Sequence, residues 1–172
     1  NTTPANTGSP SINGQPIPNG AGFCNLVVAF TDLTLPVCQN SYKIVRTWTV
    51  ISWCTSVVMR QIQVIAVMDK QAPVLTCPPI LTVSTTSSVT CSANVQLPAA
   101  GITDNCSSTF TTTMNTPVGL ISGNGGLINN VGLGTHIITY NVSDNCGNAA
   151  TCTTTLTVRD GSAPTVVCDQ YT

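Results

Sequence analysis

The sequence repeats itself along its length. The segment VMDKQAPVLTC ends at Cys77, and the segment VRDGSAPTVVC ends 91 positions later at Cys168. Both follow the pattern V-x-D-x-x-A-P-x-x-x-C. A period of this size suits one small β-sandwich domain, and tandem units of this kind are read from such repeats. We therefore expect two related units in the chain.

The two units are not equally complete. Cys24 and Cys54 of the first unit lie 30 positions apart, whereas the matching Cys91 and Cys146 of the second lie 55 positions apart. About a quarter of a repeat is therefore expected to be absent from the middle of the first unit. The expected divisions are an extended N-terminal arm, a truncated unit, a complete unit, and a first strand that serves as a donor strand or opens a next unit, at residues 1–22, 23–71, 72–160 and 161–172.

Few residues are charged, and the polar residues are mainly Thr, Ser and Asn. Charged residues make up 6% of the chain and the formal net charge is −1, so no electrostatic basis exists for binding nucleic acid or an anionic membrane. No apolar run approaches the roughly 20 residues of a membrane-spanning helix. Thr favours strands, and stretches of good helix formers are missing. The expected fold class is therefore all-β.

The second unit predicts seven short strands. Apolar and polar residues alternate in HIITYNVSD and CTTTLTVRD, which is typical of half-buried strands. Turn residues separate the segments, as at Ser122–Gly126 and Asp144–Asn148. This arrangement predicts an immunoglobulin-like Greek-key sandwich. The expected strands are 80–84, 88–97, 108–114, 118–121, 127–131, 135–143 and 150–159.

Nine cysteines are spread through this Thr-rich sequence. None of them forms a C-x-x-C pair and the chain has one histidine, so a zinc–thiolate site is not expected. Cysteines in such a setting indicate disulfides, which form in oxidising compartments. We therefore expect a secreted, extracellular protein of the cell surface whose sandwiches are stapled by disulfides.

The titratable residues do not suggest an enzyme. A Ser–His–Asp triad needs a histidine, and His136 is expected on the solvent side of a strand. Oxidised cysteines cannot act as nucleophiles. We expect no enzymatic activity, no catalytic residue and no bound cofactor.

The segment DNCGNAATCTTTLTVRDGSAPTVVC resembles the hyalin-repeat (HYR) family of immunoglobulin-like domains. Those modules open with Cys-Pro, here Cys77-Pro78, and close with D-x-x-G-N-x-x-x-C-x-x-x-V-x-V-x-D, here between Asp144 and Asp160 with Leu156 at the first Val. The resemblance covers residues 72–168. It implies tandem display on cell surfaces, adhesion and extracellular scaffolding.

The first unit is similar to a variant repeat of very large secreted surface proteins of bacteria. The segment SYKIVRTWTVISWCT carries this likeness. That variant often shows Asp-Trp-Cys or Asp-Ala-Cys, whereas this chain has Ser52-Trp53-Cys54.

The resemblance implies a disulfide between Cys77 in the first strand of a module and Cys152 in the last. Cys168 repeats Cys77 but has no last strand of its own to bond, so it is a candidate for an intermolecular disulfide. Such a bond would form near Cys24 or Cys54 of another copy.

Each unit then holds three further cysteines, and three cysteines cannot all pair among themselves. Cys106 is expected to bond either Cys91 or Cys146. For the first unit, the corresponding alternatives are Cys38 with Cys24 and Cys38 with Cys54.

Asp104 and Asp144 each begin an Asp-Asn-Cys segment. The simpler interpretation is an Asx turn, in which the aspartate caps its own loop. The alternative is a calcium site completed by Asp160 or by Asp69 at the unit junctions, since calcium takes six to eight oxygens, several of them from carboxylates. The chain has no Glu, so the supply of carboxylates is small.

Trp48 and Trp53 lie five positions apart, so along one strand they would face opposite sides. One of them is expected in the core of the first unit, and the other is a candidate surface for a sugar or a partner. Arg46 shares a face with Trp48, which allows a cation–π contact.

Two functional hypotheses follow. In the first, the chain is a subunit of an extracellular filament, in which a strand of one copy completes the truncated unit of the next. In the second, the units are spacer or display repeats of a giant cell-surface adhesin. A carbohydrate- or calcium-dependent binding module is a third reading. The expected partners are copies of the same chain or neighbouring repeats.

Overall fold

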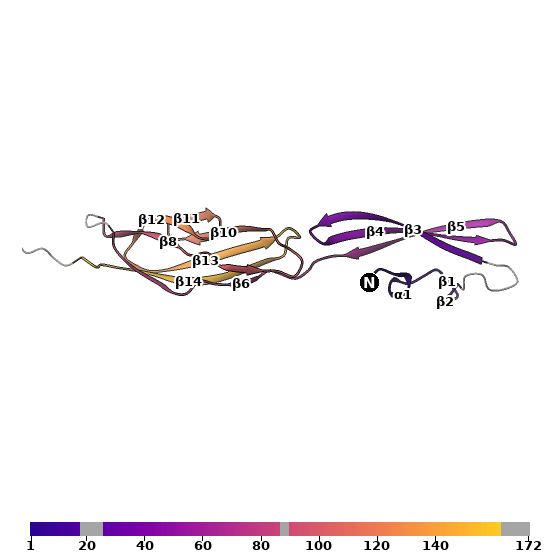
Figure 1. The fold of residues 1–172 in the computed structure, drawn as a ribbon, viewed down its shortest axis with the longest axis horizontal. Coiled ribbons are helices and arrows are strands. Elements are labelled where there is room, and N and C mark those ends of the chain that lie inside the picture. Colours follow the sequence, from indigo (N-terminus) through magenta and orange to yellow (C-terminus); the bar gives the residue numbers. More distant parts are fainter. Residues whose placement is uncertain (18–25, 87–89, 163–172) are drawn as a thin grey trace, which may run out of the picture. The chain divides into compact units, whose positions relative to one another are not determined.

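The computed structural model describes residues 1–17, 26–86 and 90–162. The chain divides into two compact units, Asn1–Asp69 and Lys70–Thr172, and almost all described secondary structure is β-strand (Figure 1). The predicted all-β class is therefore confirmed. Cys24, Cys168 and most of the segment 161–172 lie outside the described residues.

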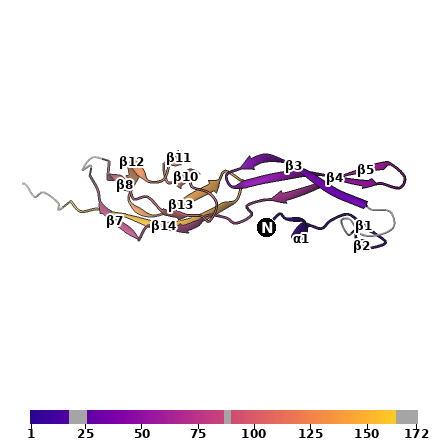
Figure 2. The same cartoon turned by 45° about the vertical axis from the view of Figure 1, so that its right-hand side comes forward.

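The first unit contains one three-stranded antiparallel sheet. Its strands are β3 (Leu26–Cys38), β4 (Ser41–Ser52) and β5 (Val57–Val67), in the order β3-β4-β5 (Figure 2). Apolar and β-branched residues alternate along β4, which suits a strand with one buried face. Asn40 turns β3 into β4 with φ of 57°, a left-handed conformation that asparagine tolerates.

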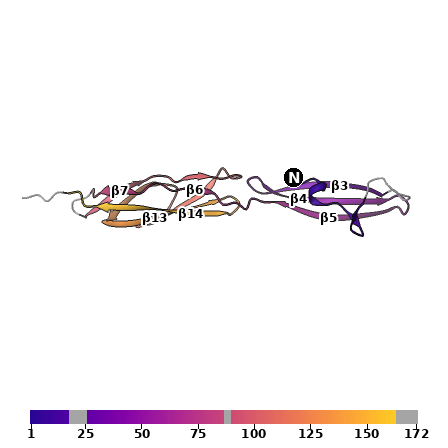
Figure 3. The same ribbon diagram turned by 90° about the horizontal axis from the view of Figure 1, so that it is seen from below.

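The N-terminal segment folds against this sheet (Figure 3). It forms one helical turn, α1 (Pro4–Thr7), and a small hairpin of β1 (Ser11–Ile12) and β2 (Gln15–Pro16). Proline at the first position suits a helix start, and Asn13-Gly14 is the preferred pair for a tight hairpin turn. The arm is therefore folded where the sequence predicted extended chain. Within the described residues, no helix has the length and apolar character that crossing a membrane requires.

The second unit contains a five-stranded sheet in the order β11-β10-β13-β14-β7. Its strands are antiparallel except that β7 runs parallel to β14. These strands are β7 (Leu81–Ser84), β10 (Phe110–Thr116), β11 (Gly119–Ser122), β13 (Gly134–Asp144) and β14 (Ala149–Arg159).

Two further strand pairs complete the second unit. β8 (Ser92–Leu97) pairs with β12 (Gly126–Gly132), and β6 (Val74–Thr76) pairs with β9 (Gly101–Thr103). All seven segments predicted from alternation form strands, and the three-residue strands β6 and β9 are additional.

One hydrophobic core holds the second unit together. Strands of the five-stranded sheet and of the β8–β12 pair contribute to it, and Leu75 and Cys77 pack against its edge. Its buried members are Ala93, Val95, Leu97, Ala100, Met114, Ile128, Val131, Ile138, Tyr140, Leu156 and Val158.

The two units share a three-strand motif. β4 pairs with β5 in the register in which β13 pairs with β14, and Trp48 opposite Gln61 matches Tyr140 opposite Cys152. β3 borders β4 as β10 borders β13. The sequence alignment had matched the segment after Cys24 with β8 instead. By this mapping, the described residues of the first unit contain no counterpart of β11 and β12 between β3 and β4, and none of the strands that precede β10.

Candidate interaction site on the first unit

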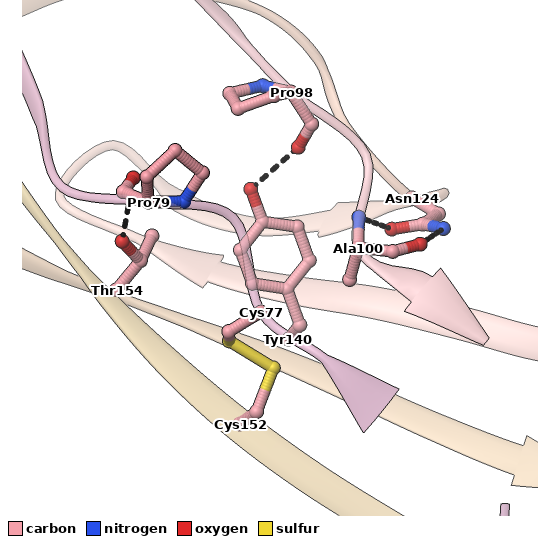
Figure 4. Close-up of a disulfide and its surroundings, with 8 residues drawn as sticks. All are labelled: Cys77, Pro79, Pro98, Ala100, Asn124, Tyr140, Cys152 and Thr154. Carbon is pink, nitrogen blue, oxygen red and sulfur yellow. Dashed lines mark hydrogen bonds between the residues drawn. A yellow bond between two sulfur atoms is a disulfide. The ribbon is translucent and has the colours of Figure 1, made fainter. Parts of the chain in front are cut away.

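The second unit shows how side chains of its sheet bind the segments that cross it (Figure 4). The structure contains the Cys77–Cys152 disulfide that the resemblance implies, with Cα atoms 5.8 Å apart. Next to it, Thr154 Oγ1 donates a hydrogen bond to the carbonyl oxygen of Pro79 at 3.1 Å. The crossing segment is thus fixed to β14 by one covalent bond and one hydrogen bond.

Tyr140 fixes a second crossing segment of this unit. Its hydroxyl donates to the carbonyl oxygen of Pro98 at 2.7 Å, and burial raises the pKa of the phenol (Figure 4). Close by, the side chain of Asn124 accepts from the N–H of Ala100 and donates to its carbonyl oxygen, both at 2.8 Å. Thr154 and Tyr140 of the five-stranded sheet, together with Asn124 of the turn before β12, therefore satisfy backbone groups of the crossing segments.

The first unit uses the matching positions in a similar way. Trp48 Nε1 donates to Gln63 Oε1 at 3.0 Å, and Gln63 Nε2 donates to the carbonyl oxygen of Thr7 in the arm. By register, Gln63 stands where Thr154 stands in the second unit. The arm therefore crosses the sheet where the Cys77–Pro79 segment crosses its own.

One difference separates the two crossings. Gln61 occupies the register position of Cys152, so no disulfide can form at this point of the first unit. Hydrogen bonds hold the arm instead.

Arg46 makes most of these bonds. Its guanidinium, 2% exposed, donates two hydrogen bonds of 2.8 Å to the carboxylate of Asp32 on the neighbouring strand. It also donates to Thr7 Oγ1 at 3.0 Å and to the carbonyl oxygen of Thr2 at 2.8 Å. A bidentate pair of this geometry is among the stronger hydrogen-bonded pairs in proteins.

The pair of charges has an electrostatic consequence for both partners. The hydrogen bonds from Arg46 hold the pKa of Asp32 below its usual value, and those same bonds raise the pKa of Arg46. Both groups therefore stay charged around neutral pH, and the anchor for the arm stays intact there.

Aromatic rings complete the site. The guanidinium carbon of Arg46 lies 4.3 Å from the ring centre of Phe30 and 5.6 Å from that of Trp48, as the shared face of Arg46 and Trp48 predicted. The two rings are 5.2 Å apart. Cation–π contacts of this kind partly compensate the loss of water around the charge.

Residues 1–17 of the arm do not seal this face of the sheet. Two pockets of about 320 and 350 Å³ lie between them, and both are lined by Pro10, Trp48 and Gln61. Phe30 is 43% exposed, whereas Met114, which occupies its register position in the second unit, is fully buried. The first unit therefore has an incompletely covered core face, by which we mean the face that bears Arg46 and Trp48.

The two tryptophans differ as expected in burial. Trp48 is 5% exposed and Trp53 is 69% exposed. Trp53 lies in the turn between β4 and β5, however, and not on the strand that carries Trp48.

Of the two calcium sets that the sequence suggests, the one completed by Asp160 is not brought together. The carboxylate oxygens of Asp104 and Asp144 approach within 4.8 Å of each other. Asp160 follows β14 at its far end, since Asp144 ends β13 beside the start of β14. Ten residues of strand, about 33 Å, separate the two ends.

Both neighbouring aspartates cap turns, as the simpler interpretation states. Asp104 Oδ1 accepts from the N–H groups of Cys106 and Ser107 at 2.8 and 2.7 Å. Asp144 Oδ1 accepts from the N–H groups of Cys146 and Asn148, both at 2.8 Å. The Oδ2 atom of Asp104 is buried and accepts no hydrogen bond.

The disulfides predicted around Cys106 differ from those observed. Cys91 is an exposed free thiol in the turn before β8, whereas Cys106 follows β9, so β8 separates the two. Cys146 is disulfide-bonded, but its partner is not Cys106. Each of these two cysteines is held in its own aspartate-capped turn.

The pairing of Cys38 with Cys54 is also wrong. Both are disulfide-bonded, but Cys38 lies beside the start of β4 and Cys54 follows its end. β4 has 12 residues and is therefore about 40 Å long, far beyond the reach of a disulfide. Cys24, the other candidate, lies outside the described part of the chain.

His136 is half-buried where the sequence predicted exposure. It shares the side of β13 that carries Ile138 and Tyr140, and its Nε2 lies 2.8 Å from the carbonyl oxygen of Gly132. The histidine is thus held by the neighbouring turn.

Comparison with known proteins gives no relative. No protein-family model matches the chain, and no curated protein sequence matches it.

Proposed function

We propose that the chain is an extracellular structural protein, the subunit of a surface filament whose immunoglobulin-like Greek-key units exchange strands between copies. The observation that carries this proposal is the incompletely covered core face of the first unit. In the second unit, β8 and β12 cover the corresponding face of β10, β13 and β14. A strand from another copy would bury the half-exposed side chains and occupy the pockets beside Trp48.

The sequence supplies a matching donor. Residues 158–168 repeat residues 67–77, and the part of that earlier segment from Val74 to Thr76 forms β6. Leu75 of β6 packs against the core of the second unit, and its repeat counterpart is Val166. A segment with this pattern suits the edge of a β-sandwich of the same kind, and head-to-tail donation builds an open-ended fibre.

Gln61 bears on the chemistry of such a joint. The arm crosses the sheet where the Cys77–Pro79 segment crosses its own, so a donor that bound as β6 does would displace the arm at this point. It would bring Cys168 to the position that Cys77 occupies, next to Gln61 rather than a cysteine. Cys54 is already disulfide-bonded. We therefore propose a joint held by backbone pairing and apolar burial, without the disulfide to Cys54 that the sequence suggested.

Competition by a peptide tests the proposal. The molar mass of the purified chain is measured by light scattering at increasing protein concentrations. Each measurement is repeated with an excess of a synthetic peptide of residues 161–172. Oligomers that lose subunits when the peptide is added support strand exchange. A peptide of scrambled sequence should leave the oligomers unchanged. Val166→Lys in the chain should abolish the oligomers, while Gln170→Lys should not. Persistence of the oligomers in Val166→Lys would overturn the proposal.

A second candidate function is a spacer or display segment of a giant adhesin. The second unit supports it, because a spacer repeat needs a core of its own and this unit has one, closed by Cys77–Cys152. The intact mass of native material separates the candidates, since a filament subunit gives a short chain and an adhesin one very large polypeptide.

A binding module is the least supported function. Trp53, at 69% exposure, is the described tryptophan that a sugar ring can reach, and a glycan array with a Trp53→Ala control tests it. The disulfides are compatible with a secreted location. We propose no enzymatic role and no resident metal.

A further inference from the structure

The sheet of the first unit has a second face, opposite to the one that the described part of the arm crosses. Because side chains alternate along a strand, every second residue of β3, β4 and β5 points away from Arg46 and Trp48. We call this the outer face. Its residues are Val27, Ala29, Thr31, Leu33 and Leu35 on β3, Lys43, Val45, Thr47, Thr49 and Ile51 on β4, and Val58, Arg60, Ile62, Val64 and Ala66 on β5.

Large aliphatic side chains on this face are open to solvent. Ile62 is 64% exposed, Val64 is 62% exposed and Leu33 is 59% exposed. Leu35 and Val58 are exposed to 44% and 53%. Single exposed aliphatic residues are normal, but a contiguous apolar patch of this kind marks an interaction surface.

The second unit provides an internal comparison. The register that matches β5 with β14 places Thr153 at the position of Ile62, and Thr155 at that of Val64. Thr157 likewise matches Ala66. The chain thus uses threonine where this face of the motif meets water, and aliphatic residues at the same positions of the first unit.

We propose that the outer face of the first unit binds the outer face of a second copy of this chain, around a two-fold axis parallel to the strands. Sheets commonly pack face to face in this manner, about 10 Å apart and rotated by about 30°. Such a contact is isologous and therefore stops at a dimer.

The area of the face suits this occupant. Three strands about 4.8 Å apart and about eleven residues long, at about 3.3 Å per residue, cover about 500 Å². Two such faces bury about 1,000 Å² in total, which is the size at which specific protein interfaces begin.

The residues of the two outer strands also complement one another in size, whereas Lys43 on the central strand lies opposite Lys43 of the other copy. A two-fold axis along the strands places β3 of one copy over β5 of the other. Three residues paired across β3, β4 and β5 therefore face the same three residues of the other copy, with the β3 and β5 positions exchanged. Arg60 then lies opposite the small side chain of Ala29 and avoids the second Arg60, which is a favourable pairing of large with small. The facing pairs are Arg60 with Ala29, Leu35 with Ala66, Leu33 with Val64 and Val27 with Val58.

This inference goes beyond the proposed function and does not depend on it. Strand exchange uses the core face and the segment 161–172, whereas the dimer uses the outer face alone. In a filament, strand exchange would join subunits along the filament, and the contact between outer faces would join neighbouring filaments.

The test copies the second unit into the first. The variant Ile62→Thr/Val64→Thr introduces the residues found at the equivalent positions of β14, so the strand is expected to keep its fold. Sedimentation equilibrium of the full chain is measured in the presence of excess peptide 161–172, which blocks strand exchange. We expect a dimer for the unchanged chain and at least a tenfold rise of its dissociation constant in the variant. The matched control is Ile137→Thr, which removes an aliphatic side chain of 69% exposure from the second unit and should change nothing.

A charge pair tests the orientation. Ala29→Glu should tighten the dimer, since it places a carboxylate opposite Arg60 of the other copy, and Ala29→Arg should weaken it several-fold. A chain that stays monomeric at all concentrations, or a dimer that Ile62→Thr/Val64→Thr leaves intact, would overturn the proposal. If peptide 161–172 did not reduce the size of oligomers larger than a dimer, that result would contradict strand exchange but not the dimer.

Discussion

Arg46 fixes the arm through its side chain, and Asp32 keeps that side chain in place. The guanidinium makes two bonds to the carboxylate and one each to Thr2 and Thr7. Each bond uses a different part of a planar, five-donor group, which a lysine ammonium cannot reproduce. The local stability of the arm therefore depends on this one residue.

Replacement of Arg46 by lysine should release the arm. We expect Arg46→Lys to speed hydrogen exchange of the amides of residues 2–7 at least tenfold, while exchange in β13 and β14 stays unchanged. Mass spectrometry of deuterated peptides measures both. Arg60→Lys, on the exposed outer face, is the matched control and should alter neither. Unchanged protection in Arg46→Lys would show that the Gln63 contact holds the arm on its own.

Asp144 makes the second unit sensitive to acid. Burial raises the pKa of this carboxyl, but hydrogen bonds from the side chain and N–H of Asn148, and from the N–H groups of Cys146 and Gly147, outweigh it and leave the pKa below 3.8. As the pH falls, Asp144 therefore takes up a proton in the unfolded chain at a higher pH than in the folded unit. The stabilisation by the ionised carboxylate is complete above about pH 4 and is lost as the pH falls through the lower pKa of the folded state.

The expected result is a fall in the urea midpoint of the second unit between pH 4 and pH 2. Asp144→Asn should be less stable at pH 7 and should lose less on acidification. The control Asp160→Asn removes an exposed carboxylate with one backbone hydrogen bond and should follow the unchanged chain. Parallel acid curves for Asp144→Asn and the unchanged chain would contradict this account.

Among the elements, the turn from β11 to β12 shows why one glycine is required. Gly125 has φ of 86°, and a Cβ there would lie 2.9 Å from the backbone nitrogen of Ala99 and from the carbonyl oxygen of Leu97. Both contacts are with backbone, which cannot move aside as a side chain does. The neighbouring Asn124 ties this turn to Ala100.

Gly125→Ala should therefore destabilise the second unit by about 1–3 kcal/mol. Gly132→Ala is the control, because Gly132 lies in β12 with no atom within 4 Å of the new Cβ, and it should stay within about 0.5 kcal/mol. Circular dichroism in urea measures both. Equal effects of the two substitutions would mean that β12 and its turn shift freely.

Elements with a clear alternation were predictable, and elements fixed by tertiary contacts were not. HIITYNVSD and CTTTLTVRD gave β13 and β14 within one residue of their ends, because eleven residues suffice to show a period of two. β6 and β9 have three residues each, too few for any period. The arm lacks an apolar pattern, and its fold depends on Arg46 and Gln63, which lie about forty to sixty positions away.

The candidate site was predictable only in part, for the same reason. Their separation by two positions on one strand placed Arg46 and Trp48 on one face and so predicted their contact. Predicting the contact between Trp48 and Gln63 requires the register of β4 with β5. The spacing of the cysteines does not determine that register. The alternative with Asp160 failed because Asp144 ends β13 and Asp160 follows β14, so the two aspartates lie at opposite ends of one hairpin.

At the scale of the whole molecule, the two units contain different spectroscopic reporters. Both tryptophans lie in the first unit, so tryptophan fluorescence reports its unfolding and circular dichroism reports that of both units. The Cys77–Cys152 disulfide, with a sequence separation of 75, constrains the second unit alone.

The variant Cys77→Ala/Cys152→Ala should cost the second unit about 2–5 kcal/mol, because the disulfide closes a long loop in the unfolded chain. We expect the circular dichroism transition in urea to split or shift, while the fluorescence midpoint stays in place. Cys91→Ser, at the exposed free thiol, is the control and should change neither signal. An equal shift of both midpoints would show that the units unfold as one.

The threonine rows of the second unit have a consequence for its hydration. The outward positions of its five-stranded sheet carry hydroxyl and amide groups, with a few apolar residues such as Leu120 and Ile137, and Arg159 is their one ionisable group among the described residues. A surface with a single charge attracts few counterions, and arginine keeps its proton at ordinary pH. The electrostatic interactions of this face therefore change little with salt concentration, or between mildly acid and mildly alkaline media.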